Sequence, residues 1–368
     1  MAVTKQMLGE SKVKEDLINK QSGMEIGIYT LADLGPDPHT GKTIGAQQRI
    51  AEIIKAGKMA DEAGLDVFGV GEHHRLDYAV SAPPIVLSAL SQVTKQIKLT
   101  SATTVLNTVD PVRLFEDFAT LDLLSNGRAE IIAGRGAFIE SFPLFGYDLN
   151  QYDKLFEENI ELFLKLNADE KVTWNGQFRS SLQNADIAPR PAQKNIPLWV
   201  GVGGTPESAE RAGRLGTGLV LAILGGDPNR FKPLVDVYRQ AAIQAGHTPG
   251  DLKVGVTGHS FISETTQQAK DEFYPYYSNY WGYLNRQHGM STQMSRADFE
   301  QFAAPETALF VGSSQQVIEK ILYQYELFGH QRFIAQMDIG GIPFKKVAEN
   351  IERLATEVAP VVRRETSK

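Results

Sequence analysis

The sequence contains no cysteine, no long apolar run and no excess of positive charge. The absence of cysteine from all 368 residues excludes disulfides, thiolate nucleophiles, iron–sulfur clusters and thiolate zinc sites. The longest apolar stretches, such as residues 219–224, are far too short to span a membrane. A formal net charge of −7 argues against nucleic acid or an anionic membrane as the main partner.

The beginning of the sequence also lacks the features of a secretory signal. Residues 1–22 are polar, carry charges of both signs and contain no apolar core. We expect them to form a polar extension, and we expect a cytoplasmic protein. Residues 23–368 are expected to form a single domain, because one α/β barrel with insertions can reach this length.

The remaining sequence alternates between strand-like and helix-like segments. Strand patterns occur at residues 24–29, 66–70, 97–102, 128–133, 197–202, 218–223, 253–261 and 332–337. A helical pattern follows each strand, and such alternation implies parallel strands joined by right-handed crossovers. Eight units of one strand and one helix fit a closed (β/α)8 barrel, or TIM barrel, with insertions. A doubly wound open sheet is the alternative.

Polar residues and glycines follow the ends of most of these strands. In chain order they are Glu72, His73, His74, Thr103, Thr104, Gly134, Arg135, Gly136, Gly203, Gly204, Thr205 and Asp338. The carboxyl ends of barrel strands meet at one rim, where barrel active sites form, so we expect these residues to gather there. The histidine pair permits acid–base chemistry near neutral pH. In an extended segment adjacent side chains face opposite ways, so at most one histidine is expected to point into the site.

Residues 201–208 have the pattern of an anion site. A strand leads into Gly203 and Gly204 and then into a helix start, where Thr205 and Ser208 add hydroxyl groups. Glycine lets the backbone approach an anion closely, and a helix start offers free N–H groups and a positive dipole. Arg135 between two glycines suits a bidentate grip on phosphate or carboxylate. The alternatives are a tight turn capped by Thr205 and a surface ion pair for Arg135.

The adjacent histidines do not predict a metal site. Glu72 would have to supply a third ligand, and the sequence has no pair of histidines at the helical spacing of zinc sites. A metal-dependent hydrolase on the same barrel is kept as an alternative, and its sensitivity to a chelator would distinguish it.

Residues 271–302 form an insertion between the seventh strand and its helix. The segment is rich in tyrosine and contains Trp281, methionine and many polar residues. Because it has no continuous helical stripe, we expect it to pack less closely than the barrel and to open at low free-energy cost. It is expected to cover the rim as a substrate-facing lid, with a dimer contact as the alternative.

Two stretches, GEHHRLDYAVSAPP from Gly71 and TSATTVLNTVDPVRLFEDFATLDLLSNGRAEIIAGRG from Thr100, give the sequence a resemblance to a known family. The sequence resembles the bacterial luciferase-like flavin-dependent monooxygenases. The resemblance implies a (β/α)8 barrel that binds flavin mononucleotide (FMN) at its carboxyl-terminal rim. By position it assigns His73 as the catalytic histidine. It assigns cofactor contacts to Ala102, Thr103, Arg135, Gly203, Gly204, Thr205 and Ser208: Ala102 and Thr103 form a cis peptide beneath the flavin ring, and the others surround the phosphate.

The resemblance also implies an activity. We expect an FMN-dependent monooxygenase or oxidoreductase that uses reduced flavin and molecular oxygen on a small organic molecule, and we expect a homodimer. No G-x-G-x-x-G motif is evident, which favours a separate flavin reductase over reduction by bound NADH. Gly134 replaces a cysteine of the luciferases and Ser141 an acidic residue, which argues against light emission. The alternatives are a deazaflavin-dependent oxidoreductase and a non-catalytic flavin-binding protein.

Overall fold

The computed structural model describes residues 23–136, 138–287 and 293–367. The predicted extension at residues 1–22 therefore lies outside the described residues.

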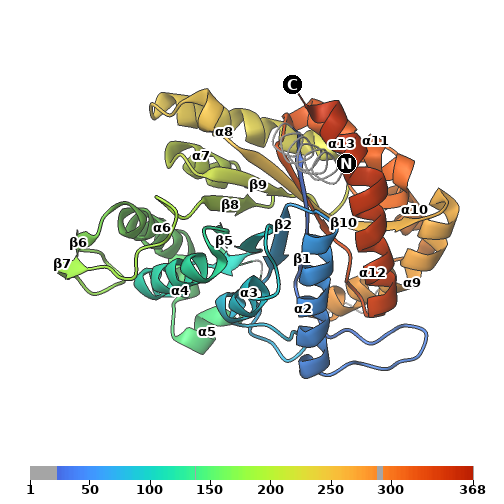
Figure 1. Ribbon diagram of the computed structural model, residues 1–368, viewed down its shortest axis with the longest axis horizontal. Helices are drawn as coiled ribbons and strands as arrows, with labels where there is room; N and C mark the ends of the chain where they lie inside the picture. The colour runs from blue at the N-terminus through green and yellow to red at the C-terminus, as the bar shows by residue number, and fades with distance from the viewer. Residues whose placement is uncertain (1–22, 137, 288–292, 368) are drawn as a thin grey trace, which may run out of the picture.

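Parallel strands of the described chain close into a barrel (Figure 1). Around the barrel they are β1 (Glu25–Thr30), β2 (Val67–Val70), β3 (Lys98–Ser101), β5 (Ala129–Gly134), β8 (Leu198–Val202), β9 (Gly218–Ala222), β10 (Val254–Ser263) and β12 (Arg332–Gln336). Strand β12 pairs with both β10 and β1, which closes the barrel. The predicted TIM barrel is confirmed, and the open-sheet alternative is wrong.

Helices cover the outside of the barrel. They are α2 (Ala46–Glu62), α3 (Pro83–Ser91), α4 (Pro111–Ser125), α6 (Tyr152–Ala168), α7 (Pro206–Arg214), α8 (Lys232–Gln244), α11 (Ser314–Phe328), α12 (Phe344–Arg353) and α13 (Ala359–Thr366). Within the described ranges, none is long and apolar enough to cross a membrane.

Local sequence sets the boundaries of α4. The side chain of Asp110 accepts hydrogen bonds from the backbone N–H groups of Val112 and Arg113, and Pro111 occupies the first turn, where a missing N–H costs nothing. The helix ends at Asn126, whose backbone is left-handed. The helix start and the stop after Ser125 both follow from short-range chemistry.

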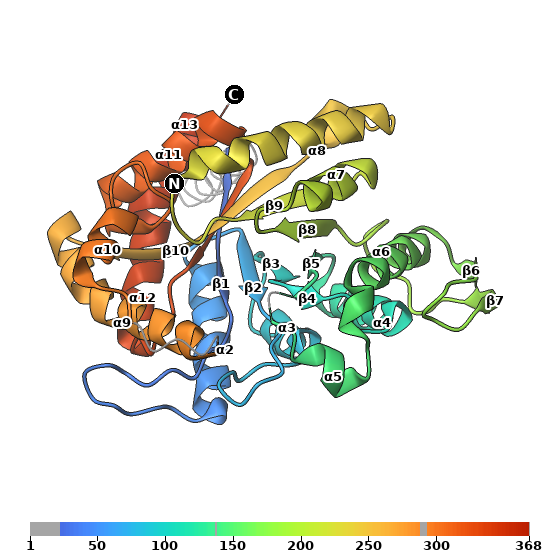
Figure 2. The same cartoon turned by 180° about the vertical axis from the view of Figure 1, so that it is seen from behind.

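Shorter elements extend the barrel. Strand β4 (Thr104–Val105) pairs with β5, and β11 (Phe310–Ser313) pairs with the end of β10. The antiparallel strands β6 (Lys171–Trp174) and β7 (Leu182–Asp186) form a hairpin, and α5 (Ser141–Phe145) is a single short turn. Figures 1 and 2 show the hairpin at one end of the molecule, with α9 (Thr266–Gln287) and α10 (Arg296–Phe302) at the other.

The predicted loose packing does not hold for the described part of the insertion. Helices α9 and α10 make up most of its described part, and residues 288–292 lie outside the described residues. Phe273, Tyr277 and Phe299 are fully buried, and the ring of Tyr277 lies 5.3 Å from that of Phe273 and 5.7 Å from that of Phe299. Their spacing places the α9 aromatics on one helical face, which packs as core.

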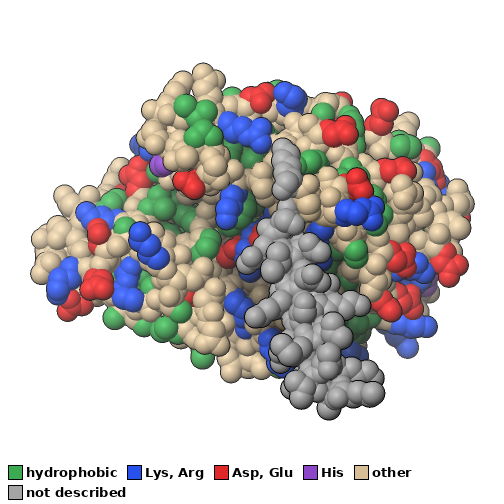
Figure 3. Space-filling model, turned by 45° about the horizontal axis from the view of Figure 1, so that its top comes forward, with side chains coloured by type: hydrophobic (Ala, Val, Ile, Leu, Met, Phe, Trp, Pro, Cys, Tyr) green, Lys and Arg blue, Asp and Glu red, His purple; other side chains and the backbone are tan. Residues whose placement is uncertain are grey.

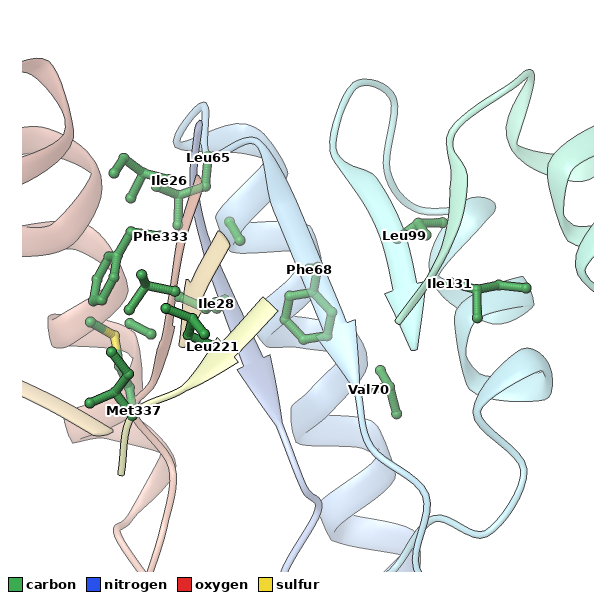
Figure 4. Close-up of a cluster of buried hydrophobic side chains, with 14 of the residues drawn as sticks. Ile26, Ile28, Leu65, Phe68, Val70, Leu99, Ile131, Leu221, Phe333 and Met337 are labelled. Carbon is green, nitrogen blue, oxygen red and sulfur yellow. The ribbon is translucent and has the colours of Figure 1, made fainter. Parts of the chain in front are cut away.

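The main core lies between the strands and the helices. Figure 4 shows Ile26, Ile28, Phe68 and Val70 from β1 and β2 within this buried cluster. Alternate residues of each strand face the other way, into the barrel. Inside the barrel a second apolar cluster includes Trp199.

A buried ion-pair cluster fills the amino-terminal end of the barrel interior. Arg332 Nη1 lies 2.5 Å from Glu130 Oε2, and Arg332 also pairs with Glu25 at 2.6 Å. The guanidinium stands 4.3 Å from the centroid of the Trp199 ring. Because this end is filled, space for a ligand is left at the carboxyl-terminal end, where TIM-barrel active sites form.

Candidate active site

A cavity of about 380 Å³ lies at the carboxyl-terminal end of the barrel. Its apolar lining includes Leu31, Val105, Val220, Leu224, Phe138 and Trp281. Its polar lining includes Glu72, His73, His74, Thr103, His259 and Gln336. A concave, largely apolar space with a few converging polar groups is the usual form of a small-molecule site.

Both histidines of the EHH segment line this cavity. His74 Nε2 lies 2.8 Å from Glu72 Oε1, and Glu72 Oε2 accepts a 3.0 Å hydrogen bond from the backbone N–H of Val105. His73 stacks on Tyr78, with ring centroids 4.0 Å apart. Strand β2 ends at Val70, so both histidines lie in the segment that follows it, and the contact of His74 with Glu72 agrees with the expectation that one of the two makes a structural hydrogen bond.

Glu140 is a functional candidate that the sequence analysis missed. Its Oε1 lies 3.6 Å from His73 Nδ1 and accepts a long hydrogen bond of 3.4 Å from the backbone N–H of His74. Partial burial alone would raise the pKa of Glu140, but the adjacent His73 holds it below its ordinary value. The resemblance implies an acidic residue where this chain has Ser141, and Glu140 stands one position earlier.

The structure brings Arg135 and Thr205 together at the barrel rim, after the neighbouring strands β5 and β8. Arg135 Nη2 donates a 3.3 Å hydrogen bond to Thr205 Oγ1, and Arg135 Nη1 pairs with the exposed Asp153 at 2.5 Å. The guanidinium also lies 5.1 Å from the ring centroid of Tyr152. The ion pair considered as an alternative for Arg135 is therefore present, but the same guanidinium also faces the start of α7.

The start of α7 has unused hydrogen-bonding groups and open space. Thr205 precedes the helix but makes no side-chain capping bond, so the capping alternative is wrong. Ser208 is buried, and its Oγ has no hydrogen-bond partner. A side chain placed at Gly203 or Gly204 would meet no atom within 4 Å, and Gly204 has a φ of +143°. These features leave room for an anion beside the unpaired hydroxyl group of Ser208.

The peptide bond between Ala102 and Thr103 is cis, as the resemblance implied. Both residues line the cavity. A Cβ atom at Gly134 would lie only 2.6 Å from Thr103 Oγ1, so a cysteine at this position would clash unless Thr103 moved. Close packing around Thr103 thus accounts for glycine where the luciferases carry cysteine.

His259 and Gln336 also line the cavity and were not anticipated from the sequence. They lie within buried strands, where pattern analysis assigns residues to the core. Burial lowers the pKa of His259 to about 4, so its imidazole is neutral near pH 7. Among the described residues, no group of three or more His, Cys, Asp or Glu side chains is arranged to hold a metal ion.

Comparison with known proteins places the chain in a family. A family model described as "Luciferase-like monooxygenase" matches residues 24–331. The oxygenase component of a flavin-dependent trigonelline monooxygenase from Acinetobacter baylyi is 25% identical over 356 residues, which cover 92% of this chain and 95% of the relative. The chain belongs to the luciferase-like monooxygenase family.

Solved structures share the fold. The oxygenating constituent of 3,6-diketocamphane monooxygenase from Pseudomonas putida, a type II Baeyer–Villiger monooxygenase in complex with FMN, superposes with a TM-score of 0.74 at 22% identity, covering 92% of this chain and 98% of that one. An F420-dependent secondary alcohol dehydrogenase superposes with a TM-score of 0.70 at 19% identity, covering 92% of this chain and 99% of that one.

Proposed function

We propose that this chain binds FMN at the barrel rim and uses reduced FMN with molecular oxygen to oxygenate a small organic molecule. The observation that carries the proposal is the group formed by Arg135, Thr205 and Ser208 beside the cavity that His73 lines. A phosphate at the start of α7 would satisfy the unpaired Ser208 hydroxyl and would occupy the space left by Gly203 and Gly204. The residues present therefore fit a flavin phosphate.

The flavin ring would then enter the cavity. Ala102 and Thr103 form part of the cavity wall and would contact the ring. Reduced FMN, when bound, supplies the electrons that activate oxygen. The apolar side chains Val105, Leu224 and Trp281 would exclude water from the reacting groups.

His73 is the proposed acid or base of the reaction. Its Nδ1 faces the carboxylate of Glu140 at 3.6 Å, which favours a proton on that nitrogen. With Nδ1 protonated, Nε2 is the nitrogen that accepts or donates a proton during the reaction. Stacking on Tyr78 fixes the plane of the imidazole, so Glu140 and Tyr78 act as positioning residues.

A deazaflavin is the second candidate cofactor, because an F420-dependent enzyme shares the fold. FMN is favoured because the relative from Acinetobacter baylyi is named as flavin-dependent. The same name, which specifies an oxygenase component, supports a separate reductase as the source of reduced flavin. Family membership sets aside the metal-dependent hydrolase and the non-catalytic flavin-binding protein.

We also propose that the chain forms a homodimer in the cytoplasm. Ile85 on α3 and Leu123 and Leu124 on α4 are exposed apolar side chains on two helices that pack against each other. On the face seen in Figure 3, basic and acidic side chains are interspersed, which does not favour a nucleic-acid partner. Analytical ultracentrifugation tests the dimer, and a single monomeric species at micromolar concentration would contradict it.

Cofactor titration tests the proposed function. Calorimetry of the purified chain with FMN, riboflavin and F420 should give the tightest binding for FMN. Reduced FMN supplied by an unrelated reductase should then support oxygen consumption that depends on an added organic substrate. Tighter binding of F420 than of FMN, or oxygen consumption that no substrate stimulates, would contradict the proposal.

A further inference from the structure

The cavity ends against a group of neighbouring polar side chains that the proposed flavin chemistry does not use. His259 on β10 and Gln336 on β12 are direct partners in the register of these strands. Gln336 is likewise the partner of Tyr29 on β1. Three adjacent strands therefore place an imidazole, an amide and a phenol at one level of the barrel, and all three residues line the cavity.

The imidazole and the amide lack hydrogen-bond partners. His259 is 1% exposed and Gln336 is 0% exposed. Both ring nitrogens of His259 and both amide atoms of Gln336 are unpaired in the described structure. Buried polar atoms without partners are costly, and the adjacent cavity is the space from which a ligand can supply partners.

This group is electrically neutral. Burial lowers the pKa of His259 to about 4, and burial raises the pKa of the Tyr29 and Tyr280 hydroxyls. The ring of Tyr280 stands edge-on to His259 at 5.3 Å. A neutral imidazole offers one donor and one acceptor, and a carboxamide offers both as well. The matching ligand group is therefore uncharged and carries a donor beside an acceptor.

The group lies across the barrel from the proposed flavin contacts. In the closed strand order, β10 stands opposite β3 and β12 stands opposite β5. The Ala102–Thr103 peptide follows β3, and Arg135 follows β5. A flavin ring against Ala102 and Thr103 would leave His259 and Gln336 on the far wall, on the side where α9 contributes Tyr280 and Trp281.

We propose that His259 and Gln336 form the subsite that recognises the substrate, and that the substrate carries an amide or lactam group. This inference rests on the proposed function. The imidazole and the carboxamide would each exchange a hydrogen bond with the N–H and C=O of that group, while Leu224 and Trp281 contact its apolar part. The pyrimidine ring of the flavin also has an edge with N–H and C=O groups. The experiment below therefore distinguishes binding of a substrate amide from binding of the flavin edge.

An unpaired amide alone does not make a site, and the chain provides a matched control. Gln324 on α11 is 1% exposed, and both of its amide atoms are also unpaired, yet it does not line the cavity. Gln336→Met and Gln324→Met both remove a buried amide while conserving side-chain length. Loss of ligand recognition specific to Gln336→Met would therefore not come from general destabilisation.

The probes are 3,4-dihydroquinolin-2-one and 2-tetralone. They have the same bicyclic shape, but the ketone has a methylene group where the lactam has its N–H. Calorimetry on the FMN-loaded chain should show the lactam binding about 10-fold more tightly than the ketone, as expected for an added hydrogen-bond pair. Gln336→Met and His259→Phe should abolish this preference, Gln324→Met should preserve it, and the affinity for FMN should change less than about 2-fold.

Three outcomes would overturn the inference. Equal affinity for lactam and ketone in the unmodified chain would mean that the polar group holds ordered water only. Loss of FMN affinity in Gln336→Met as large as the loss of lactam preference would assign the group to the flavin edge. Preservation of the preference in both cavity variants would place the lactam elsewhere. If the chain instead binds lactam selectively but never binds FMN, the subsite stands and the proposed function fails.

Discussion

At the scale of single residues, the proposed site depends on a few side chains whose surroundings prepare them for a ligand. Ser208 has a buried hydroxyl without a partner, and Arg135 reaches the same helix start from another strand end. His73 is held between a tyrosine ring and a carboxylate. Each arrangement makes a specific prediction for one substitution.

Arg135→Ala should weaken FMN binding by about 10- to 100-fold, because a charge-assisted contact to phosphate contributes roughly 1.5–3 kcal/mol. Affinity for riboflavin, which has no phosphate, should change much less. Arg113→Ala, which removes an exposed arginine of α4, is the control and should leave both affinities unchanged. Calorimetric titration measures them, and equal losses for FMN and riboflavin in Arg135→Ala would count against a phosphate contact.

His73→Ala should lower the rate of substrate oxygenation by about 100-fold or more, which is the usual contribution of a positioned acid or base. Affinity for FMN should be nearly unchanged, because the phosphate contacts are intact. The measurement is product formation from substrate, reduced FMN and oxygen. An active His73→Ala variant beside an inactive His74→Ala variant would show that the wrong histidine was chosen.

At the scale of elements, the sequence predicted the barrel well because each strand and helix is set by local pattern. Asp110, Pro111 and Asn126 bound α4 through contacts within a few residues. Glu140, His259 and Gln336 could not be found this way, since their roles depend on which strands and loops meet in space. The insertion was misjudged for the same reason: its sequence has no continuous helical stripe, but Phe273 packs as core against Phe261 of β10 and Tyr277 against Phe299 of α10.

The insertion should therefore divide into a structural part and a part that faces the cavity. Tyr277→Ala removes a fully buried ring and should lower the free energy of unfolding by roughly 3–5 kcal/mol, measured by denaturant titration. Trp281→Ala should cost less, because Trp281 is only partly buried, but should increase hydrogen peroxide release per oxygen consumed. Unchanged peroxide release in Trp281→Ala would argue against the expectation that the insertion is a substrate-facing lid.

At the scale of the whole molecule, the two ends of the barrel differ. An ion-pair cluster fills the amino-terminal end, and the cavity lies at the carboxyl-terminal, open end. The Arg332–Glu130 pair links β12 to β5 across the barrel interior at the amino-terminal end. Burial alone would raise the pKa of Glu130, but the Arg332 guanidinium lowers it to about 2, against an ordinary value of 4.5. A carboxyl with a lowered pKa stabilises the fold above its ordinary pKa, and this contribution is lost as pH falls toward its folded value.

Glu130→Gln should lower the free energy of unfolding at neutral pH by roughly 3–5 kcal/mol, because it leaves a buried arginine without one of its charge partners. The decrease in stability between about pH 4.5 and pH 2 should also be smaller in this variant than in the unmodified chain. Glu349→Gln breaks an exposed pair with Lys345 and should change stability little. Denaturant titrations across this pH range compare the three proteins. If the stability of Glu130→Gln and that of the unmodified chain fall in parallel with pH, the loss of stability is not due to Glu130.

The central claim is that FMN binds at the open end with its phosphate at the start of α7. A crystal structure of the chain with FMN tests this most directly. The phosphate oxygens should lie within hydrogen-bond distance, about 2.7–3.2 Å, of Arg135 and of the hydroxyl groups of Thr205 and Ser208, with the ring against Ala102 and Thr103. A phosphate bound away from these residues, or a ring outside the cavity, would contradict the account.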